Sequence, residues 1–260
     1  MPASSTKPFL DPAADVWFTE ERKSRLRRIL GPASPILLLS GHYRSVFDYW
    51  IRSELSEEAC SNPAIWPADE RQQTLDAVKA SWKEQHPNGH SYLTDEQIDL
   101  KLTINPGSQQ WARYQWGHRI ETLYLESKDQ LDAVSFWMLR LKDKNLAAEI
   151  YYSLCAKECG FEHVVRKYGL PEDQSRNGYW TNVPKGQLPE GLPDVLSKLQ
   201  KGQLSSPVRV GKQVALIQLE ENIPSRLDHS MEKKLLMLEL GRWIDQMIPA
   251  VVAQLESLGS

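Results

Sequence analysis

The 260-residue sequence predicts an α+β protein in which a helical first half precedes a compact unit of mixed strands and helices. In the first half, apolar residues recur at helical spacing, and glycine or proline interrupts them at intervals. From residue 131 onward, short runs rich in β-branched and aromatic residues alternate with short helical patterns. A long amphipathic stretch after Asp228 then follows. We therefore expect a helical region, a sheet-containing unit and a long closing helix.

Capping residues support the helices of the first half. Thr19 precedes two acidic residues and an apolar pattern, and Thr94 with Gln97 has the spacing of a capping box. Pro106-Gly107 is expected to interrupt the chain. The predicted helices are residues 20–29, 36–59, 69 to the turn at 86–89, 94 to the break at 106, and 111–125.

The second half predicts a sheet with short connecting helices. Residues 133–141 (AVSFWMLRL) are rich in β-formers, and Gly160 stands where it would end a helix. Asp228 is expected to cap the final helix. Strands are predicted at 133–141, from the Gly178-Tyr179-Trp180 segment, at 207–210 and at 213–219, and helices at 147–158, 161–168 and 191–199.

Composition excludes several classes of function. A net charge of -3 argues against a general nucleic-acid binder, and the basic cluster at 22–28 is read as the solvated face of a helix. No apolar run approaches the ~18 residues that a membrane span requires, residues 36–39 being a short apolar patch. The first residues lack the pattern of a secretory signal, so we expect a cytoplasmic protein with no membrane insertion.

The three cysteines are too few and too odd in number for a disulfide framework. Cys155 and Cys159 would share a helical face, but no histidine or acid joins them at ligand spacing. Two buried core thiols are the favoured interpretation over a metal site. Neither a metal nor a cofactor is expected.

Four segments of the second half have a recognisable pattern: KGQLSSPV at 201–208, FEHVVRKY at 161–168, the turn at 178–180, and LIQLEE at 216–221. They resemble the parvulin family of peptidyl-prolyl cis-trans isomerases, of the PpiC/SurA-like type. The segment at 201–208 is the strongest match, because its Gly, Ser, Pro and Val follow the family's order without a gap. The resemblance implies a parvulin-like domain with a four-stranded sheet.

The flanking helices resemble the SurA-type chaperone layout, in which the terminal helix packs back on the N-terminal helices. The sequence Pro224-x-x-Leu227-Asp228 is similar to a cyanobacterial branch of such proteins. The layout divides the chain into a disordered lead at 1–14, a helical chaperone-like domain at 15–130, a parvulin-like domain at 131–223 and a C-terminal helix at 224–260.

The residues that parvulins use for catalysis are missing here. The family places a histidine on each of two neighbouring strands, and these positions carry over to Met138 and Ala215. Its Cys or Asp position carries over to Pro171. No histidine lies in 132–145 or 205–222, so a shifted alignment does not restore them. Glu172 and Asp173 could substitute, although solvated loop acids are the favoured interpretation.

The sequence leaves the function open between three alternatives. One is a weakened isomerase, and whether the chain is an enzyme stays undecided. A second is a chaperone that binds unfolded, extended or proline-containing clients, with Phe136, Met138, Trp180 and Ala215 as the peptide-binding residues. Trp137 could also line such a pocket, and core packing is the alternative for these aromatic residues. The third is a non-catalytic structural or adaptor subunit of a peptide export or assembly system.

Overall fold

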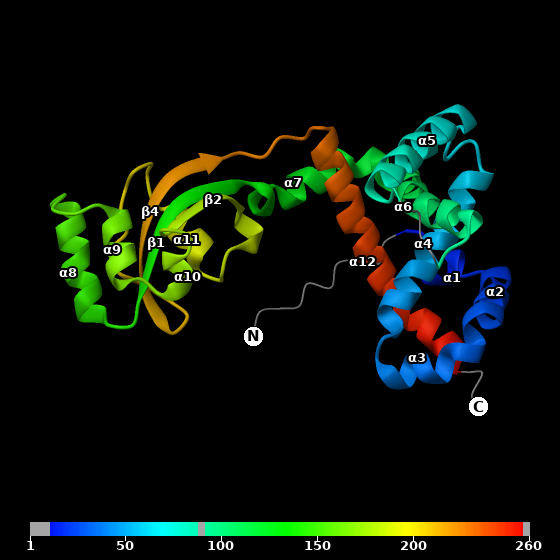
Figure 1. Ribbon diagram of the computed structural model, residues 1–260, viewed down its shortest axis with the longest axis horizontal. Coiled ribbons are helices and arrows are strands. Elements are labelled where there is room, and N and C mark those ends of the chain that lie inside the picture. The colour runs from blue at the N-terminus through cyan, green and yellow to red at the C-terminus, as the bar shows by residue number, and fades with distance from the viewer. Residues whose placement is uncertain (1–10, 88–91, 257–260) are drawn as a thin grey trace. The chain divides into compact units, whose positions relative to one another are not determined.

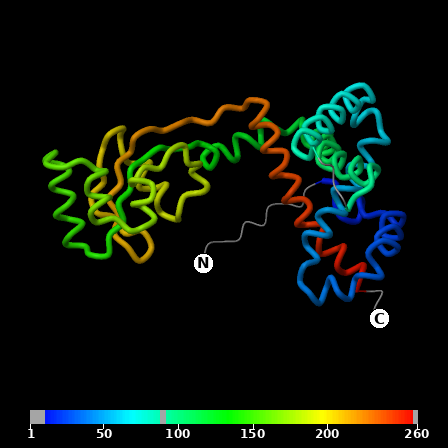
Figure 2. The backbone as a smooth tube through the Cα atoms, viewed as in Figure 1, coloured from blue at the N-terminus to red at the C-terminus, as the bar shows by residue number. Residues whose placement is uncertain are grey.

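The computed structural model describes residues 11–87 and 92–256, and the chain divides into two units. The first comprises Met1–Glu121 with Asp228–Ser260, and the second comprises Thr122–Leu227. Figure 2 follows the chain as it leaves the first unit and returns to it with the long C-terminal helix. The two divisions fall within helix α7 (Ile120–Leu131) and just before helix α12 (His229–Glu256).

The first unit is helical, as predicted, and the α+β class of the chain is confirmed (Figure 1). No helix within residues 11–87 and 92–256 is both long and apolar enough to span a membrane. The helices of this unit besides α12 are α1 (Ala14–Trp17), α2 (Glu20–Leu30), the 3-10 turn η1 (Gly31–Ala33), α3 (Ser34–Ser40), α4 (Tyr43–Ser61), α5 (Ala68–Gln85), α6 (Asp95–Trp116) and the 3-10 turn η2 (Gly117–Arg119).

Tryptophan side chains build the core of the helical unit. Trp243 of α12 is completely buried, and its ring lies 5.2 Å from that of Trp17 and 5.1 Å from that of Trp111. Its indole nitrogen donates to the carbonyl of Pro12 at 2.8 Å. Trp116 likewise donates to the carbonyl of Asp11 at 2.9 Å. Residues 11–14 are therefore held by the core, whereas residues 1–10 of the predicted disordered lead lie outside the described residues.

The predicted break at Pro106-Gly107 is wrong, because α6 continues through both residues. Gly107 is buried where α6 crosses α4, and a Cβ there would lie 2.9 Å from the Cα of Ser56. The Ser56 hydroxyl donates to the carbonyl of Thr103, one turn below Pro106. The glycine thus allows a close helix crossing, and packing outweighs the hydrogen bond that proline removes.

Replacing Gly107 tests this close crossing. Gly107→Ala is expected to destabilise the helical unit by about 1–3 kcal/mol, since backbone atoms must shift to admit the methyl group. Gly241→Ala is the matched control, because Gly241 lies inside α12 and a Cβ there meets nothing within 4 Å. That control is expected to stabilise by about 0.5–1 kcal/mol. Urea unfolding of both variants measures the two effects, and equal effects would contradict the packing argument.

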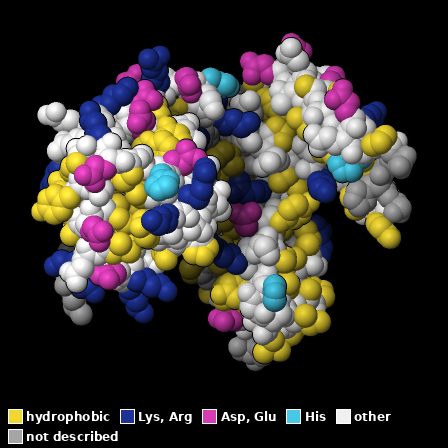
Figure 3. Space-filling model, turned by 60° about the vertical axis from the view of Figure 1, so that its left-hand side comes forward, with side chains coloured by type: hydrophobic (Ala, Val, Ile, Leu, Met, Phe, Trp, Pro, Cys, Tyr) yellow, Lys and Arg dark blue, Asp and Glu magenta, His cyan; other side chains and the backbone are white. Residues whose placement is uncertain are grey.

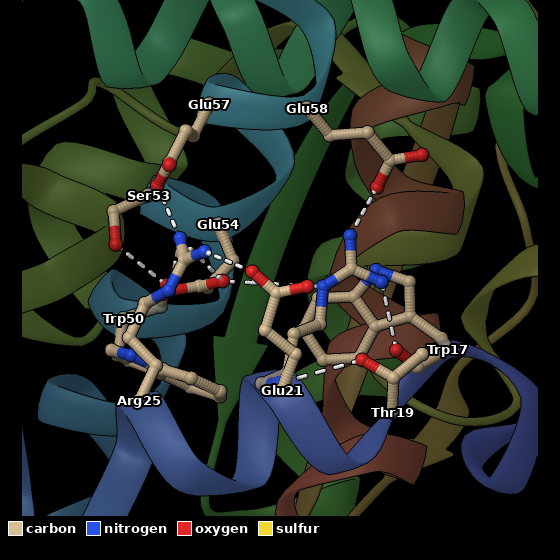
Figure 4. Close-up of polar contacts among 10 residues, drawn as sticks. Trp17, Thr19, Glu21, Arg25, Trp50, Ser53, Glu54, Glu57 and Glu58 are labelled. Carbon is tan, nitrogen blue, oxygen red and sulfur yellow. Dashed lines mark hydrogen bonds and ion pairs between the residues drawn. The ribbon is translucent and has the colours of Figure 1, made fainter. Parts of the chain in front are cut away.

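Two arginines of the basic cluster of α2 do not lie on the solvated helix face that the sequence predicts. Arg22 contacts Glu58 of α4. Figure 4 shows Arg25 directed toward α4, where it lies 3.3 Å from Glu54. Glu54 is only 5% exposed, and its burial raises its pKa against the opposing effect of Arg25. The arginine side chains are 19% and 24% exposed, so these charges fasten α2 to α4.

Other boundaries differ from the prediction for local reasons. The predicted helix over 36–59 is divided at Gly41, whose φ of +70° ends α3 before α4 begins. The Thr19 cap, the capping box of Thr94 and the Asp228 cap are confirmed. Leu238 of α12 is 53% exposed, because it lies off the stripe that carries Trp243.

The second unit contains the four-stranded sheet that the resemblance implies. The sheet is antiparallel, with the strand order β2-β1-β4-β3. Helices α8 and α9 cover one face and α11 the other (Figure 1). Its elements after α7 are β1 (Ala133–Leu141), α8 (Lys144–Cys155), α9 (Phe161–Tyr168), α10 (Pro171–Gln174), β2 (Tyr179–Pro184), the 3-10 turn η3 (Lys185–Gln187), α11 (Leu192–Ser197), β3 (Val208–Val210) and β4 (Gln213–Ile223).

The cysteine prediction is wrong for this unit. Cys155 is the last residue of α8 and is exposed, while Cys159 is half-buried in the segment that follows. The two do not share a helical face because the helix ends between them. Gly160 precedes α9 rather than ending α8, and the left-handed conformation after α8 belongs to Lys157, with φ of 56°.

Candidate functional site

The sheet face covered by α11 carries Met138 and Ala215, the two positions to which the resemblance assigns the histidines of parvulins. We call its buried residues, with those of α11 that pack on them, the apolar sheet face. Met138 of β1 and Ala215 of β4 both belong to it, at 3% and 0% exposure. Its members are Val134, Phe136, Met138, Ala215, Ile217 and Leu219 of the sheet and Leu192 and Leu196 of α11. The structure therefore brings Met138 and Ala215 into one cluster of hydrocarbon and thioether groups.

Strand register explains how the chain builds this face. In β1, side chains alternate between the two faces, so Phe136, Met138 and residue 140 point the same way. The Cα of Met138 pairs with Ile217, and that of Arg140 pairs with Ala215. No group of the apolar sheet face can donate or accept a proton at neutral pH, so it offers desolvation but no acid–base chemistry.

Trp180 of β2 packs against the rim of this face. Its ring is half-buried and stacks on Phe136, with centroids 6.1 Å apart and planes 5° from parallel. The guanidinium of Arg176 lies 4.5 Å from the centre of the Trp180 ring. Of the four predicted peptide-binding residues, Trp180 has the most exposed side chain; Phe136, Met138 and Ala215 lie beneath the surface.

The turn before Trp180 requires glycine. Gly178 has φ of +77°, and a Cβ there would lie 2.5 Å from Val165 and 3.1 Å from the carbonyl oxygen of Met138. Its own carbonyl accepts from the amide of Met138 at 2.8 Å. The turn thereby fixes the start of β2 against the centre of β1 and sets the position of Trp180.

Arg140 and Asp173 form a polar cluster at the end of the same sheet face. Asp173 is completely buried, and its carboxylate accepts from the backbone amide of Arg140 at 2.9 Å and from its guanidinium at 2.7 and 3.0 Å. The pairing of β1 with β2 runs only as far as Trp137, so the Arg140 amide lies outside the paired region. The Asp173 carboxylate accepts the hydrogen bond of that amide. The Arg140 pKa is raised, chiefly by its hydrogen bond to Asp173.

The interpretation of Asp173 as a solvated loop acid is therefore wrong. The segment that was expected to be a loop includes helix α10, which begins at Pro171 and carries Asp173 inward. Glu172 is 76% exposed, as that interpretation expects, and contacts Arg140 at 2.8 Å. Pro171 is exposed and is not part of the apolar sheet face. Both candidate substitutes are engaged by one arginine, which opposes their use as bases.

Sequence reasoning missed Arg140, although a signal was present. It is the one charged residue in the run 133–141, and alternation from Met138 places it on the same face. Trp137, which was considered for the pocket, lies on the opposite face and packs against Phe161 and Tyr179. His163 is exposed on α9, remote from the apolar sheet face.

Comparison with known proteins identifies the domain. Residues 140–221 match the family model of the rotamase, or PPIC-type PPIase, domain. No curated protein matches the chain. Among solved structures, the chain is similar to the peptidylprolyl isomerase PrsA of Bacillus anthracis, at 14% identity and a TM-score of 0.42, covering 80% of this chain and 95% of that one.

Two further structures show a comparable similarity. The foldase protein PrsA of Streptococcus pneumoniae has 15% identity and a TM-score of 0.46, with 93% of this chain and 90% of that chain covered. A structure of the SurA-like chaperones PEB4 and Cj1289 of Campylobacter jejuni has 14% identity and a TM-score of 0.35, with 96% and 95% covered. The assignment itself rests on the family model: the second unit of this chain carries a PPIC-type PPIase domain of the parvulin family.

Proposed function

We propose that the chain is a parvulin-like chaperone that binds unfolded or proline-containing segments, with isomerase activity weak or lost. The observation that carries the proposal is the composition of the apolar sheet face. Met138 and Ala215, to which the resemblance assigns the histidine positions, are buried apolar residues of this face, and the sheet and the Gly178 turn are formed around them. Ground-state binding of a peptide needs only complementarity, so it survives the loss of groups that act in the transition state.

Trp180 is the residue we assign to first contact with the client. Its half-buried ring is stacked on Phe136, and the Arg176 guanidinium lies over the ring, so the domain holds the indole in place. Aromatic rings held in this way supply large apolar contact area at low entropic cost. Because an extended client loses conformational freedom on binding, we expect affinities in the micromolar range or weaker.

The remaining parts of the proposal concern location and partners. We propose a cytoplasmic protein with polypeptide clients, no nucleic-acid partner and no inserted segment. A contact with an export system is consistent with this role. The alternative of a purely structural adaptor would be favoured if no client peptide binds.

Replacing Trp180 tests the proposed binding site. Trp180→Ala is expected to weaken binding of a proline-containing apolar peptide by about tenfold, since a buried aromatic contact is lost. Tyr152→Ala is the matched control, because Tyr152 is 70% exposed on α8, which covers the opposite face of the sheet. Fluorescence anisotropy of a labelled peptide measures both affinities, with circular dichroism to confirm folding. Equal affinities for the two variants and the unaltered chain would contradict the assignment.

A further inference from the structure

An apolar patch on the helical unit has no role in the proposed function. We call it the α3 patch: Ile29, Pro32, Pro35, Ile36 and Leu39. Ile29 is 52% exposed, Ile36 74% and Leu39 90%. The two prolines are exposed as well. Ile36 and Leu39 lie three residues apart on α3, whereas Ile29 lies near the end of α2 and Pro32 in the 3-10 turn between the two helices.

Most of the basic residues beside the α3 patch pair with carboxylates from outside residues 22–47. That range contains six Lys or Arg and no Asp or Glu. Arg22 pairs with Glu58, Arg25 pairs with Glu57 (Figure 4), and Arg44 pairs with Asp245 at 2.6 Å. Lys23 and Arg27 share the single carboxylate of Glu20. Arg28, next to Ile29, is exposed and has no carboxylate partner within the described residues.

We propose that the helical unit docks peripherally on an anionic lipid surface through the α3 patch, with Arg28 contacting the headgroups. Large apolar side chains beside a basic residue are a pattern of interfacial membrane binding. Arg28 adds attraction to anionic lipids, which line the cytoplasmic surface of cell membranes. Docking of this kind requires no membrane-spanning helix.

The shape of the α3 patch favours lipid over a client peptide. A side chain that is 90% exposed projects from the surface, whereas peptide-binding sites are grooves or strand edges that enclose the bound side chain. Hydrophobic side chains gather on the lower part of the helical unit in Figure 3, the part where α3 lies in Figure 1. A projecting Leu39 can enter the acyl region of a bilayer without any rearrangement of the unit.

Flotation of the full chain with lipid vesicles tests the proposal. We expect binding to vesicles of phosphatidylcholine with phosphatidylglycerol, little binding to phosphatidylcholine alone, and a loss of binding as salt is raised. Leu39→Glu is expected to reduce binding at least about tenfold, because a charge replaces the inserted side chain. Arg28→Glu is expected to reduce binding to the anionic vesicles only.

Leu238→Glu provides the matched control, since Leu238 is 53% exposed on α12 of the same unit. It should bind vesicles like the unaltered chain. The proposal is overturned if the unaltered chain does not float with anionic vesicles. It is also overturned if Leu238→Glu loses as much vesicle binding as Leu39→Glu. It is also overturned if Leu39→Glu loses peptide binding but not vesicle binding, because the α3 patch would then be a client surface. The Trp180 experiment is independent of each of these outcomes.

Discussion

Isomerase turnover by the full chain on a short proline peptide is expected to lie at least about 100-fold below that of an ordinary parvulin, since positioned acid–base groups contribute that much or more. Rotation about the prolyl bond faces a barrier of about 18–20 kcal/mol, and the catalyst must favour the twisted amide over the planar one. Here Met138 and Ala215 supply only an apolar surface. A protease-coupled or NMR exchange assay at substoichiometric protein measures the turnover.

A double variant separates the missing residues from other causes. Met138→His with Ala215→His is expected to raise turnover above that of the unaltered chain, provided that circular dichroism shows a folded protein. The check matters because both positions are buried and Ala215 has no room beyond its methyl group without rearrangement. Robust turnover by the unaltered chain would contradict the prediction and would direct attention to Glu172 and Asp173.

Asp173→Ala is expected to destabilise the parvulin-type unit by about 3–5 kcal/mol, the range for breaking a buried ion pair from one side. The substitution leaves the backbone amide and the guanidinium of Arg140 without their shared acceptor. It also removes the contact that joins α10 to the end of β1. Urea unfolding, followed through the amide NMR signals of strands β1 and β4, measures the effect.

Two further variants identify which part of the interaction matters. Glu172→Ala should change the stability by no more than about 0.5 kcal/mol, because Glu172 is 76% exposed and its ion pair is screened by solvent. The loss of stability for Asp173→Asn should fall between those of Asp173→Ala and Glu172→Ala, since the amide oxygen of asparagine can still accept from the Arg140 backbone amide. A loss for Glu172→Ala as large as that for Asp173→Ala would show that the cluster is not organised around the buried carboxylate.

The sheet-containing unit was the more predictable part of the chain. Strand β1 and helix α9 have the bounds that the sequence predicts, since charged or glycine residues flank short runs of one clear pattern. The break at Pro106 was predicted wrongly, because the tolerance of a proline inside α6 depends on a close crossing with α4 that no local pattern reveals. Local propensity gave way to tertiary packing at that point.

The candidate site was predicted in part. Alternation along β1 and β4 places Met138 and Ala215 on one face, and this could be derived from strand periodicity together with the resemblance. The burial of Asp173 could not be derived from the sequence. It depends on where β2 begins opposite β1 and on the short helix α10. The role of Arg140 could not be predicted either, because its charge lies in a buried strand and its partner, Asp173, is identified only by the structure.

Exchange spectroscopy on a proline-containing peptide tests the central claim, binding without catalysis, in a single sample. Two-dimensional NMR reports binding through shifts of the peptide resonances and catalysis through cross-peaks between the cis and trans forms. We expect the resonances to shift as the full chain is added, while the exchange cross-peaks stay at the level of the free peptide. Cross-peaks that grow at substoichiometric protein, or resonances that do not move at any concentration of protein, would contradict the account.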